Sequence, residues 1–373
     1  MSAGGQPEEA MRILVRSTNW LGDAVMSTPA LTRLREKFPA AYITVFTHEK
    51  LRDVWLHHSA VNETITFGGS EVFFAVIKKL RAGKFDIALV LPNSSRSALE
   101  VWAAGIPQRI GYARPWRNFF LTHAVPTRPG HEAMHKRTPD EVKQLIAQPT
   151  QNPKPETRNF SAHQIHEYLY LIGTLGAKTE PLPPQLFVTA EEIEAAKKKF
   201  GLSGITQPVF GLNPGAEYGP AKRWPVERFI AAAKEIQQRM NCIWVLFGGK
   251  GDVALTSQIE SEIQNSKFEM KNLAGQTSLR ELMAVLSQCR LLLTNDTGPM
   301  HVAAALGTPV VVPFGSTSPE LTGPGLPGDA KNRLILADVP CAPCFLRECP
   351  IDFRCMKSIS VEQVVEAVQS IAR

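Results

Sequence analysis

The most constraining feature of this sequence is an alternation of short apolar runs with longer amphipathic stretches, which appears in each half of the chain. Alternation of this kind predicts parallel sheets built from βαβ units. We therefore expect an α/β fold with two Rossmann-like, doubly wound domains. The expected strands are 12–15, 42–46, 64–67, 86–91, 209–212, 243–247, 310–313 and one that begins at 291, and the expected helices are 24–37, 72–81, 162–175, 226–239, 279–287 and 361–371.

The length of 373 residues also favours two domains, because a single hydrophobic core rarely grows to that size. The proline-rich stretch at 179–184 cannot continue a helix, and we place the domain boundary there. The expected organisation is a loose tail over 1–10, an N-terminal domain over 11–180, a C-terminal domain over 181–355, and a last helix within 356–373 that packs across both. Ligands of doubly wound sheets bind beyond the carboxyl ends of the strands, so we expect a cleft between the domains.

Composition is typical of a soluble enzyme. Apolar residues make up 44% of the chain and charged residues 20%, which disfavours disorder, collagen and disulfide scaffolds. No apolar run is long enough to cross a bilayer, and the N-terminal tail lacks the basic start and apolar core of a secretory signal. We therefore expect a cytoplasmic protein.

The net charge of +6 lies entirely in the first half of the chain. Residues 1–180 hold 22 Lys and Arg against 16 Asp and Glu, whereas residues 181–373 hold 19 of each. The first half therefore favours an anionic partner. Nucleic acid is disfavoured as that partner, because the chain has no RNP signature, zinc-finger spacing or basic heptad helix. The first half's arginines include Arg96, Arg109, Arg114, Arg117 and Arg128.

The segment 291–301 has the layout of an anion site. An apolar strand runs into a polar turn with Asp296, Thr297 and Gly298, and then into a helix. The first N–H groups of a helix have no internal partner and lie at the positive end of its dipole, so a phosphate binds well there. His301 lies one turn further along. Asp296 and Thr297 fit a purely structural helix cap equally well.

Three further loops follow predicted strands. Gly22 and Asp23 lie where the first strand gives way to a helix, and the loop lacks the GxGxxG spacing of a dinucleotide-binding fold. The loop after residue 212 carries Gly215 and then Lys222 and Arg223, and a lysine there suits a phosphate. A third, glycine-rich loop ends at Asp252 and is a weak signal by itself.

Taken together, these loops resemble the lipopolysaccharide heptosyltransferases of glycosyltransferase family 9. The resemblance spans nearly all of the chain from residue 11. It is closest to the heptosyltransferase II branch, on account of Trp20, the segment 98–107 and the tail at Cys341 and Cys344. The motifs that carry it are residues 11–15, 20–23, 91–93, 213–215, 222–225 and 295–301.

The resemblance implies a GT-B fold, with the acceptor on the first domain and the nucleotide sugar on the second. The implied donor is ADP-L-glycero-β-D-manno-heptose, and the implied acceptor is the phosphorylated inner core on lipid A, at the cytoplasmic face of the inner membrane. Asp23 would be the catalytic base, and Lys222 would contact the donor diphosphate. The implied donor-binding residues are Asn213, Gly215, Lys222, Arg223, Asp252, Asp296, Thr297, Gly298 and His301, and the implied acceptor-binding residues are Asn19, Trp20, Asn93, Arg96 and Arg117.

The implied reaction needs no cofactor. Asp23 would take the proton of the acceptor hydroxyl while its oxygen attacks the anomeric carbon, and Lys222 with the helix N-terminus would oppose the charge of the departing ADP. The sequence shows no Asp-X-Asp pair placed for a divalent ion, so we expect metal-independent chemistry.

Two points stay open at the level of the sequence. Cys341, Cys344, Cys349 and Cys355 fit either a tetrahedral structural zinc site or reduced thiols that pack locally. The alternatives to the proposed activity are a sugar-nucleotide epimerase of GT-B fold, a family 9 transferase with another core acceptor, and a lipopolysaccharide-binding protein without catalysis.

Overall fold

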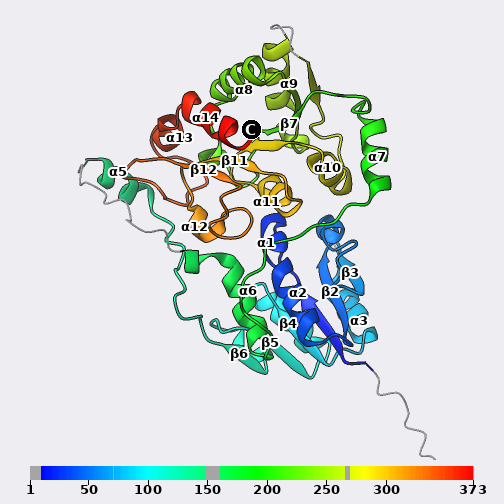
Figure 1. The fold of residues 1–373 in the computed structure, drawn as a ribbon. Helices are drawn as coiled ribbons and strands as arrows, with labels where there is room; N and C mark the ends of the chain where they lie inside the picture. The colour runs from blue at the N-terminus through cyan, green and yellow to red at the C-terminus, as the bar shows by residue number, and fades with distance from the viewer. Residues whose placement is uncertain (1–9, 70, 148–159, 265–268, 373) are drawn as a thin grey trace, which may run out of the picture. The chain divides into compact units, whose positions relative to one another are not determined.

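A computed structural model describes residues 10–69, 71–147, 160–264 and 269–372 (Figure 1). The contacts within the chain divide it into two compact units. One consists of Met1–His131 and Gln164–Leu182, and the other of Glu132–His163 and Pro183–Arg373. The chain therefore enters the second unit twice, whereas the sequence led us to expect one crossing near residue 180.

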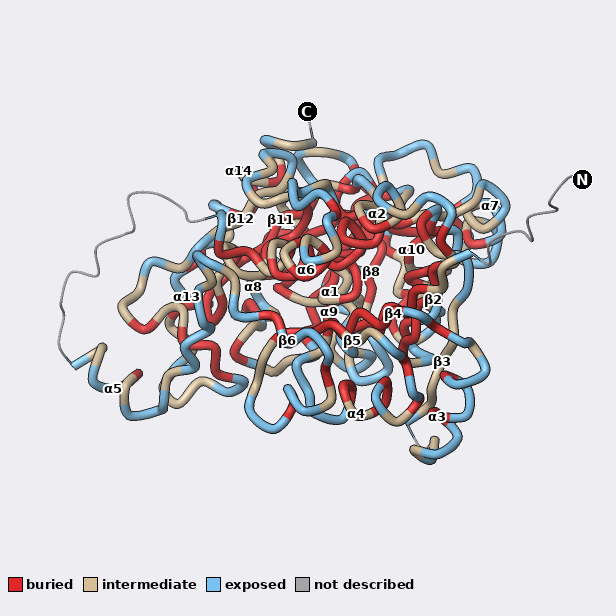
Figure 2. The backbone as a smooth tube through the Cα atoms, turned by 90° about the horizontal axis from the view of Figure 1, so that it is seen from below, coloured by how far each residue is buried: buried red, intermediate tan, exposed pale blue. Residues whose placement is uncertain are grey.

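The first unit is built on a six-stranded sheet in which every pairing is parallel. Helices α2 and α6 contact each other on one face of this sheet, and α3 and α4 contact each other on the opposite face (Figure 2). The strand order is β3-β2-β1-β4-β5-β6. The strands are β1 (Arg12–Arg16), β2 (Tyr42–His48), β3 (Glu63–Phe67), β4 (Ile87–Val90), β5 (Gln108–Tyr112) and β6 (His123–Val125), and the helices are α1 (Leu21–Met26), α2 (Thr28–Lys37), η1 (Glu49–Val54), α3 (Phe73–Ala82), α4 (Ser95–Ala103), η2 (Asn118–Phe120) and α6 (Gln164–Gly173).

The second unit repeats this plan with another parallel six-stranded sheet, in the order β12-β11-β10-β7-β8-β9. Its strands are β7 (Val209–Asn213), β8 (Ile243–Leu246), β9 (Met270–Asn272), β10 (Leu291–Thr294), β11 (Val310–Phe314) and β12 (Arg333–Leu336). Its helices are α5 (Pro139–Ala147), η3 (Phe160–Ala162), α7 (Ala190–Lys199), η4 (Pro220–Lys222), α8 (Val226–Met240), η5 (Lys250–Asp252), α9 (Val253–Gln264), α10 (Leu279–Leu286), α11 (Gly298–Ala305), α12 (Pro319–Thr322), α13 (Arg354–Ser358) and α14 (Val361–Ala372).

In both sheets the order in which the strands are added reverses at an inner strand pair. In the first sheet β1 pairs with β4, and in the second β7 pairs with β10. At such a switch point the two loops that leave the carboxyl ends of the strands diverge to opposite faces, which opens a crevice between them. The switch points therefore mark where each unit offers a binding site.

The predicted helix over 24–37 is two helices in the structure. Helix α1 ends at Met26 and α2 begins at Thr28, with Ser27 between them. Pro29 lies in the first turn of α2 and has no N–H to bond the preceding turn. A proline inside a helical pattern therefore ends one helix and begins the next.

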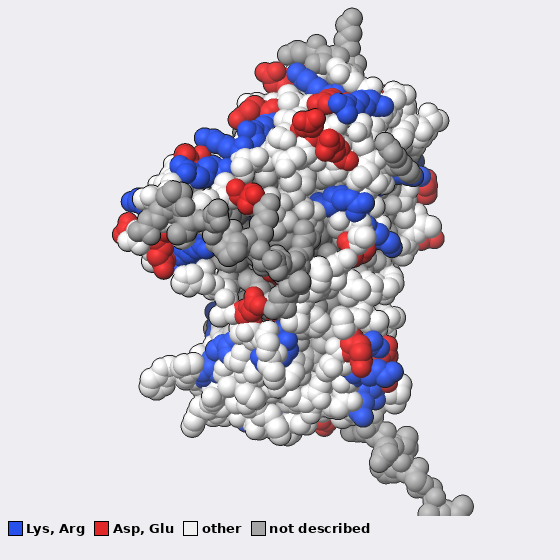
Figure 3. Space-filling view, turned by 60° about the vertical axis from the view of Figure 1, so that its left-hand side comes forward, with Lys and Arg blue, Asp and Glu red and all other residues white. Residues whose placement is uncertain are grey.

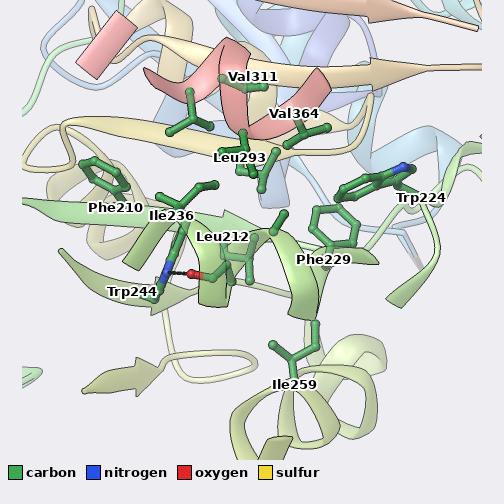
Figure 4. Packing of buried hydrophobic residues seen from close by; sticks show 14 of the residues in the cluster. Phe210, Leu212, Trp224, Phe229, Ile236, Trp244, Ile259, Leu293, Val311 and Val364 are labelled. Carbon is green, nitrogen blue, oxygen red and sulfur yellow. Dashed lines mark hydrogen bonds between the residues drawn. The ribbon is translucent and has the colours of Figure 1, made fainter. Parts of the chain in front are cut away.

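The core of the second unit is a cluster of aromatic and aliphatic side chains from both sheet and helices (Figure 4). Phe229 and Ile236 of α8 pack there together with Val364 of α14. Trp244 of β8 is fully buried, and its Nε1–H donates to the carbonyl oxygen of Ala233 at 3.1 Å. Helix α14 contacts α8 and also β10, β11 and β12 within this unit.

We predict that Ile236→Ala lowers the free energy of unfolding of the second unit by about 2–5 kcal/mol, because Ile236 has no exposed surface and its truncation leaves a cavity in the cluster. Chemical denaturation followed by the fluorescence of the buried tryptophans measures the change. Gln238→Ala, on the exposed side of the same helix, is the matched control. Equal stability of the two variants would contradict this description of the core.

Candidate functional site

The anion site predicted at 291–301 has the expected backbone. Strand β10 is fully buried and ends at Thr294, and α11 begins at Gly298 with Pro299 in its first turn. Thr297 is the N-cap residue in an extended conformation, and its side chain makes no capping hydrogen bond. The first N–H groups of α11 therefore have no side-chain cap from Thr297, which favours the anion-binding interpretation over the structural one.

Lys222 lies at this helix N-terminus. Its Nζ donates to Oδ2 of Asp296 at 2.6 Å, and the hydroxyl of Thr317 donates to the same oxygen at 2.6 Å. The ammonium group also lies 5.0 Å from the ring centroid of Tyr218. Lys222 is mostly buried and Asp296 fully so. The loop after β7 and the loop after β10 thus meet in one ion pair.

Two asparagines tie these loops together. The amide of Asn213 donates to the hydroxyl of Thr294 across the β7–β10 pair at 3.0 Å. The amide of Asn295 donates to the carbonyl oxygen of Pro214 at 2.7 Å, and its side-chain oxygen accepts the N–H of Trp224 at 3.0 Å. Asn213 is buried, so the structure gives it the role of joining two strand ends, whereas the resemblance implied contact with the donor.

His301 is buried beside the ion pair. Burial lowers the pKa of His301 to about 4, with Asp296 acting in the opposite direction and His163 and Lys222 adding to the decrease. The imidazole is therefore neutral near pH 7. His163, whose Nε2 lies 3.0 Å from the carbonyl oxygen of Gly323, is a neighbour that sequence patterns did not indicate.

Gly215, Arg223 and Asp252 form a second group at the same sheet edge. The Asp252 carboxylate accepts the N–H of Gly249 at 3.0 Å and lies 3.8 Å from the Arg223 guanidinium. A Cβ atom at Gly215 would lie 2.5 Å from the Asp252 carboxylate, so a larger residue there would displace that carboxylate. Asp252 thus closes its own turn, and Arg223, which is 43% exposed, is open to a ligand.

Asp23 lies in the first turn of α1, directly after the switch-point strand β1. The phenol of Tyr168, from α6, donates to Oδ1 of Asp23 at 3.1 Å. Burial, and then the charge of Asp23, raises the pKa of Tyr168 well above its usual value, so the phenol stays protonated and remains a donor. Sequence reasoning missed Tyr168, because its partner lies 145 positions away.

Two of the implied acceptor residues border the same edge beside Asp23. Trp20 is the N-cap residue of α1 and is 56% exposed. Asn19 is exposed, and its side-chain oxygen accepts from Arg16 at 3.2 Å. Arg16 in turn forms a buried ion pair with Glu100 at 3.1 Å.

Asn93 and Arg96 follow β4, on the other side of the switch point. Asn93 is exposed, and Arg96 is 65% exposed with one contact to Glu100 at 3.3 Å. Arg117, by contrast, is fully buried, and its guanidinium donates to the carbonyl oxygens of Tyr112, Val90 and Pro92. The expected acceptor contact by Arg117 therefore does not fit the structure, where this arginine braces the strand ends.

The cysteine-rich loop is a packed structure of free thiols. Cys341 and Cys344 lie in a hydrophobic cluster with Val142 of α5 and Leu346. Burial raises the pKa of Cys341, Cys344 and Cys355, the last to about 12, so these thiols stay protonated. Among the residues that the structure describes, no group of three or more His, Cys, Asp or Glu side chains is placed to hold a metal ion.

The second unit has no large surface region of one charge on the face that Figure 3 shows. On the face in Figure 3, acidic and basic side chains lie interspersed in the upper part, which is the second unit. This agrees with the equal numbers of acidic and basic residues in its half of the sequence. The second unit therefore offers an anion local positive charge, such as that of Lys222, and not a broad positive field. Within the described residues, no helix combines the length and the hydropathy of a membrane span.

Comparisons with known proteins agree with this arrangement. The family model for glycosyltransferase family 9 (heptosyltransferase) matches residues 73–353. The lipooligosaccharide heptosyltransferase 2 of Haemophilus ducreyi is 31% identical over 84% of this chain and 86% of its own. The lipopolysaccharide heptosyltransferase 2 of Escherichia coli is 32% identical over 84% and 85%. The structure of the E. coli ADP-heptose lipopolysaccharide heptosyltransferase II superposes with a TM-score of 0.75, at 28% identity, over 97% of this chain and 98% of that one.

The two Rossmann-like sheets are thus those of a GT-B enzyme, and the chain is a glycosyltransferase that belongs to family 9, the heptosyltransferase family.

Proposed function

We propose that this enzyme transfers L-glycero-D-manno-heptose from ADP-heptose to the inner core of lipopolysaccharide, in the manner of a heptosyltransferase II. The observation that carries the proposal is a division of chemistry between two switch points. The first sheet offers a carboxylate, Asp23, held by a neutral donor. The second offers an ammonium group at a helix N-terminus, which suits a diphosphate.

Asp23 acts as the general base in this proposal. It accepts the proton of the acceptor hydroxyl as that oxygen forms a bond to the anomeric carbon, and the bond from that carbon to ADP breaks on the opposite face. The configuration at the anomeric carbon is therefore inverted. A positioned base contributes typically 10²–10⁴-fold to such a step. The hydrogen bond from Tyr168 to one carboxylate oxygen orients the Asp23 side chain for this proton transfer.

Lys222 and the α11 N-terminus stabilise the departing ADP. An ammonium group has three N–H donors, and the bond to Asp296 uses one of them. Asp296 and Thr317 hold the ammonium in place before the reaction, so little reorganisation is needed when charge develops on the leaving group. The neutral His301 adds no competing positive charge to this pair. We propose that no metal ion takes part.

The phosphorylated inner core and its lipid anchor account for the basic first half of the chain. We propose that the enzyme works at the cytoplasmic face of the inner membrane, as a peripheral protein that contacts the lipid surface.

Release of ADP from ADP-heptose, measured with and without a de-acylated inner-core acceptor, tests the proposed activity. Acceptor-dependent release is expected, whereas conversion of the donor without acceptor would instead indicate an epimerase.

For the base, we predict that Asp23→Asn lowers kcat by about 100-fold or more, because an amide cannot accept the proton. Binding of ADP to the variant, measured by calorimetry, is expected to stay at the wild-type level. Wild-type turnover by this variant would remove Asp23 from the mechanism.

For the phosphate contact, we predict that Lys222→Ala weakens ADP binding by on the order of 1.5–3 kcal/mol, the value of a hydrogen bond to a charged group. The substitution also leaves the Asp296 carboxylate without its ammonium partner beside the diphosphate, which adds repulsion. Calorimetric titration with ADP measures the loss. Lys234→Ala, on α8 of the same unit, removes the same charge away from the site and should bind ADP normally.

For the positioning residue, we predict that Tyr168→Phe lowers kcat, changes KM little, and moves the acidic limb of the kcat–pH profile to higher pH. The direction follows because the Asp23 carboxylate loses a hydrogen bond that favours its charged form. Tyr170→Phe removes a phenol from the same helix, where Tyr170 stacks on Tyr112, and is the matched control. A uniform loss of activity at all pH values, without movement of the limb, would speak against this role.

A further inference from the structure

The first unit presents aromatic rings to solvent on and beside α4. Trp116 is 90% exposed, Phe119 is 79% exposed and Trp102 is 44% exposed. Phe120, which packs against the core, links two of them, since its ring centroid lies 5.6 Å from that of Trp102 and 5.6 Å from that of Phe119. We call these four residues the aromatic face. Rings exposed to this degree usually mark an interaction site when they are contiguous.

The turn that carries Trp116 and Phe119 is held firmly. Trp116 has a φ of 60°, in the left-handed region that is rare for a bulky side chain. The buried Arg117 anchors the turn through its bonds to backbone carbonyls, and the side-chain oxygen of Asn118 accepts the N–H of Arg114 at 2.8 Å. The exposure of Trp116 is therefore imposed by a braced backbone and does not result from a loose loop.

The segment of the chain that carries the aromatic face is rich in arginine. Residues 87–131 contain five arginines and a single acidic residue, Glu100. Glu100 is buried and pairs with Arg16 and Arg96, so this stretch presents no carboxylate to solvent. Arg96 is 65% exposed, and Arg114 lies two residues before Trp116. The partner of this surface is therefore anionic and accepts aromatic rings.

The aromatic face borders the proposed acceptor residues. Helix α4 begins just after Asn93 and has Arg96 in its first turn, while Trp102 lies near its other end and η2 packs beside it. This helix covers the face of the first sheet opposite to α2 and α6, and exposed residues line its outer side (Figure 2). A lipid-anchored acceptor that reaches Asn93 and Arg96 would therefore approach along the aromatic face.

We infer that the aromatic face, with Arg96 and Arg114, docks onto the surface of an anionic phospholipid bilayer. This inference rests on the proposed function and names the surface that makes the membrane contact. Trp and Phe rings settle at the level of the lipid headgroups, and each arginine beside them gains attraction to lipid phosphates. A second copy of the chain is disfavoured as the partner, because two such faces would bring like charges together. Single-stranded nucleic acid also combines phosphates with stacking bases, but its platforms line a groove that follows the strand, whereas Trp116 projects from the surface.

Sedimentation of the full-length protein with vesicles tests the inference. Wild-type protein should bind vesicles that contain phosphatidylglycerol much better than vesicles of phosphatidylcholine alone. Trp116→Ser and Phe119→Ser should each weaken binding to the anionic vesicles by about tenfold, because part of a ring's burial is lost. Both sites are exposed, so the folded state should be unaffected.

Phe74→Ser is the matched control, since Phe74 is also 79% exposed in the same unit but lies on α3, outside the aromatic face. Wild-type binding by this variant, with loss in the other two, supports the docking surface. An equal loss of vesicle binding in all three variants would overturn the docking surface. So would a finding that Trp116→Ser and Phe119→Ser weaken binding to a single-stranded oligonucleotide as much as they weaken binding to vesicles.

Turnover separates this inference from the proposed function. With a water-soluble, de-acylated acceptor, Trp116→Ser and Phe119→Ser should keep wild-type kcat and KM, whereas KM should rise for acceptor embedded in anionic vesicles. If the wild-type enzyme uses neither acceptor, the proposed activity is wrong. The vesicle-binding results then still show whether the aromatic face binds the membrane. Unchanged KM with embedded acceptor, together with unchanged vesicle binding, would refute the docking surface alone.

Discussion

The parallel pairing of β7 with β10 is the constraint on which the proposed donor site depends. These strands are adjacent in the sheet although α8, β8, α9, β9 and α10 lie between them in sequence. Their register brings Asn213 opposite Thr294. The loops that follow therefore begin side by side and diverge. Lys222 from one loop and Asp296 from the other meet in that space, at the N-terminus of α11. The same arrangement at β1 and β4 places Asp23, in the first turn of α1, and Asn93, in the loop after β4, beyond the two strand ends of the first switch point.

Burial sets what the ion pair of the donor site can do. A carboxylate as enclosed as Asp296 is costly unless it is paired, and here it receives bonds from both Lys222 and Thr317. The pair contributes little net stability by itself, because desolvation offsets most of the attraction. In the proposed function its value lies in position, since it fixes an ammonium group where the donor diphosphate would bind. The side-chain entropy of Lys222 is lost when the protein folds, so the reaction itself does not have to order this side chain.

The local parts of this fold could be predicted from sequence, and the long-range parts could not. The strand, turn and helix at 291–301 form a continuous pattern with its own start signals, and they appear in the structure as expected. Strand β5 was missed because its sequence, with Gln108, Arg109 and Gly111, does not resemble a buried strand. The roles of Tyr168 and Thr317 depend on partners 145 and 21 positions away, for which a single sequence holds no signal. Arg117 shows the opposite kind of error. Its place among several arginines suggested a side chain that faces solvent or a ligand, whereas both terminal nitrogens of Arg117 donate to backbone carbonyls.

The cysteine-rich loop acquires a structural meaning once its hydrogen bonds are followed. The N–H groups of Cys344 and Phe345 donate to the carbonyl oxygen of Ser316, next to the threonine that bonds Asp296. On its other side, the loop accepts the hydroxyl of Tyr218 at Phe345 and the N–H of Ala221 at Arg347. The loop thus joins the segment that carries Lys222 to the turn that carries Thr317.

That joining loop needs a cover, because the thiols of Cys341 and Cys344 are protonated and Leu346 is apolar. Val142 of α5 supplies the cover by packing on Cys341, Cys344 and Leu346. Arg137, just before α5, donates its N–H to the carbonyl oxygen of Cys344 at 3.0 Å. Helix α5 therefore has a physical reason to lie in the second unit, since Val142 shields the loop that joins the segment of Lys222 to the turn of Thr317.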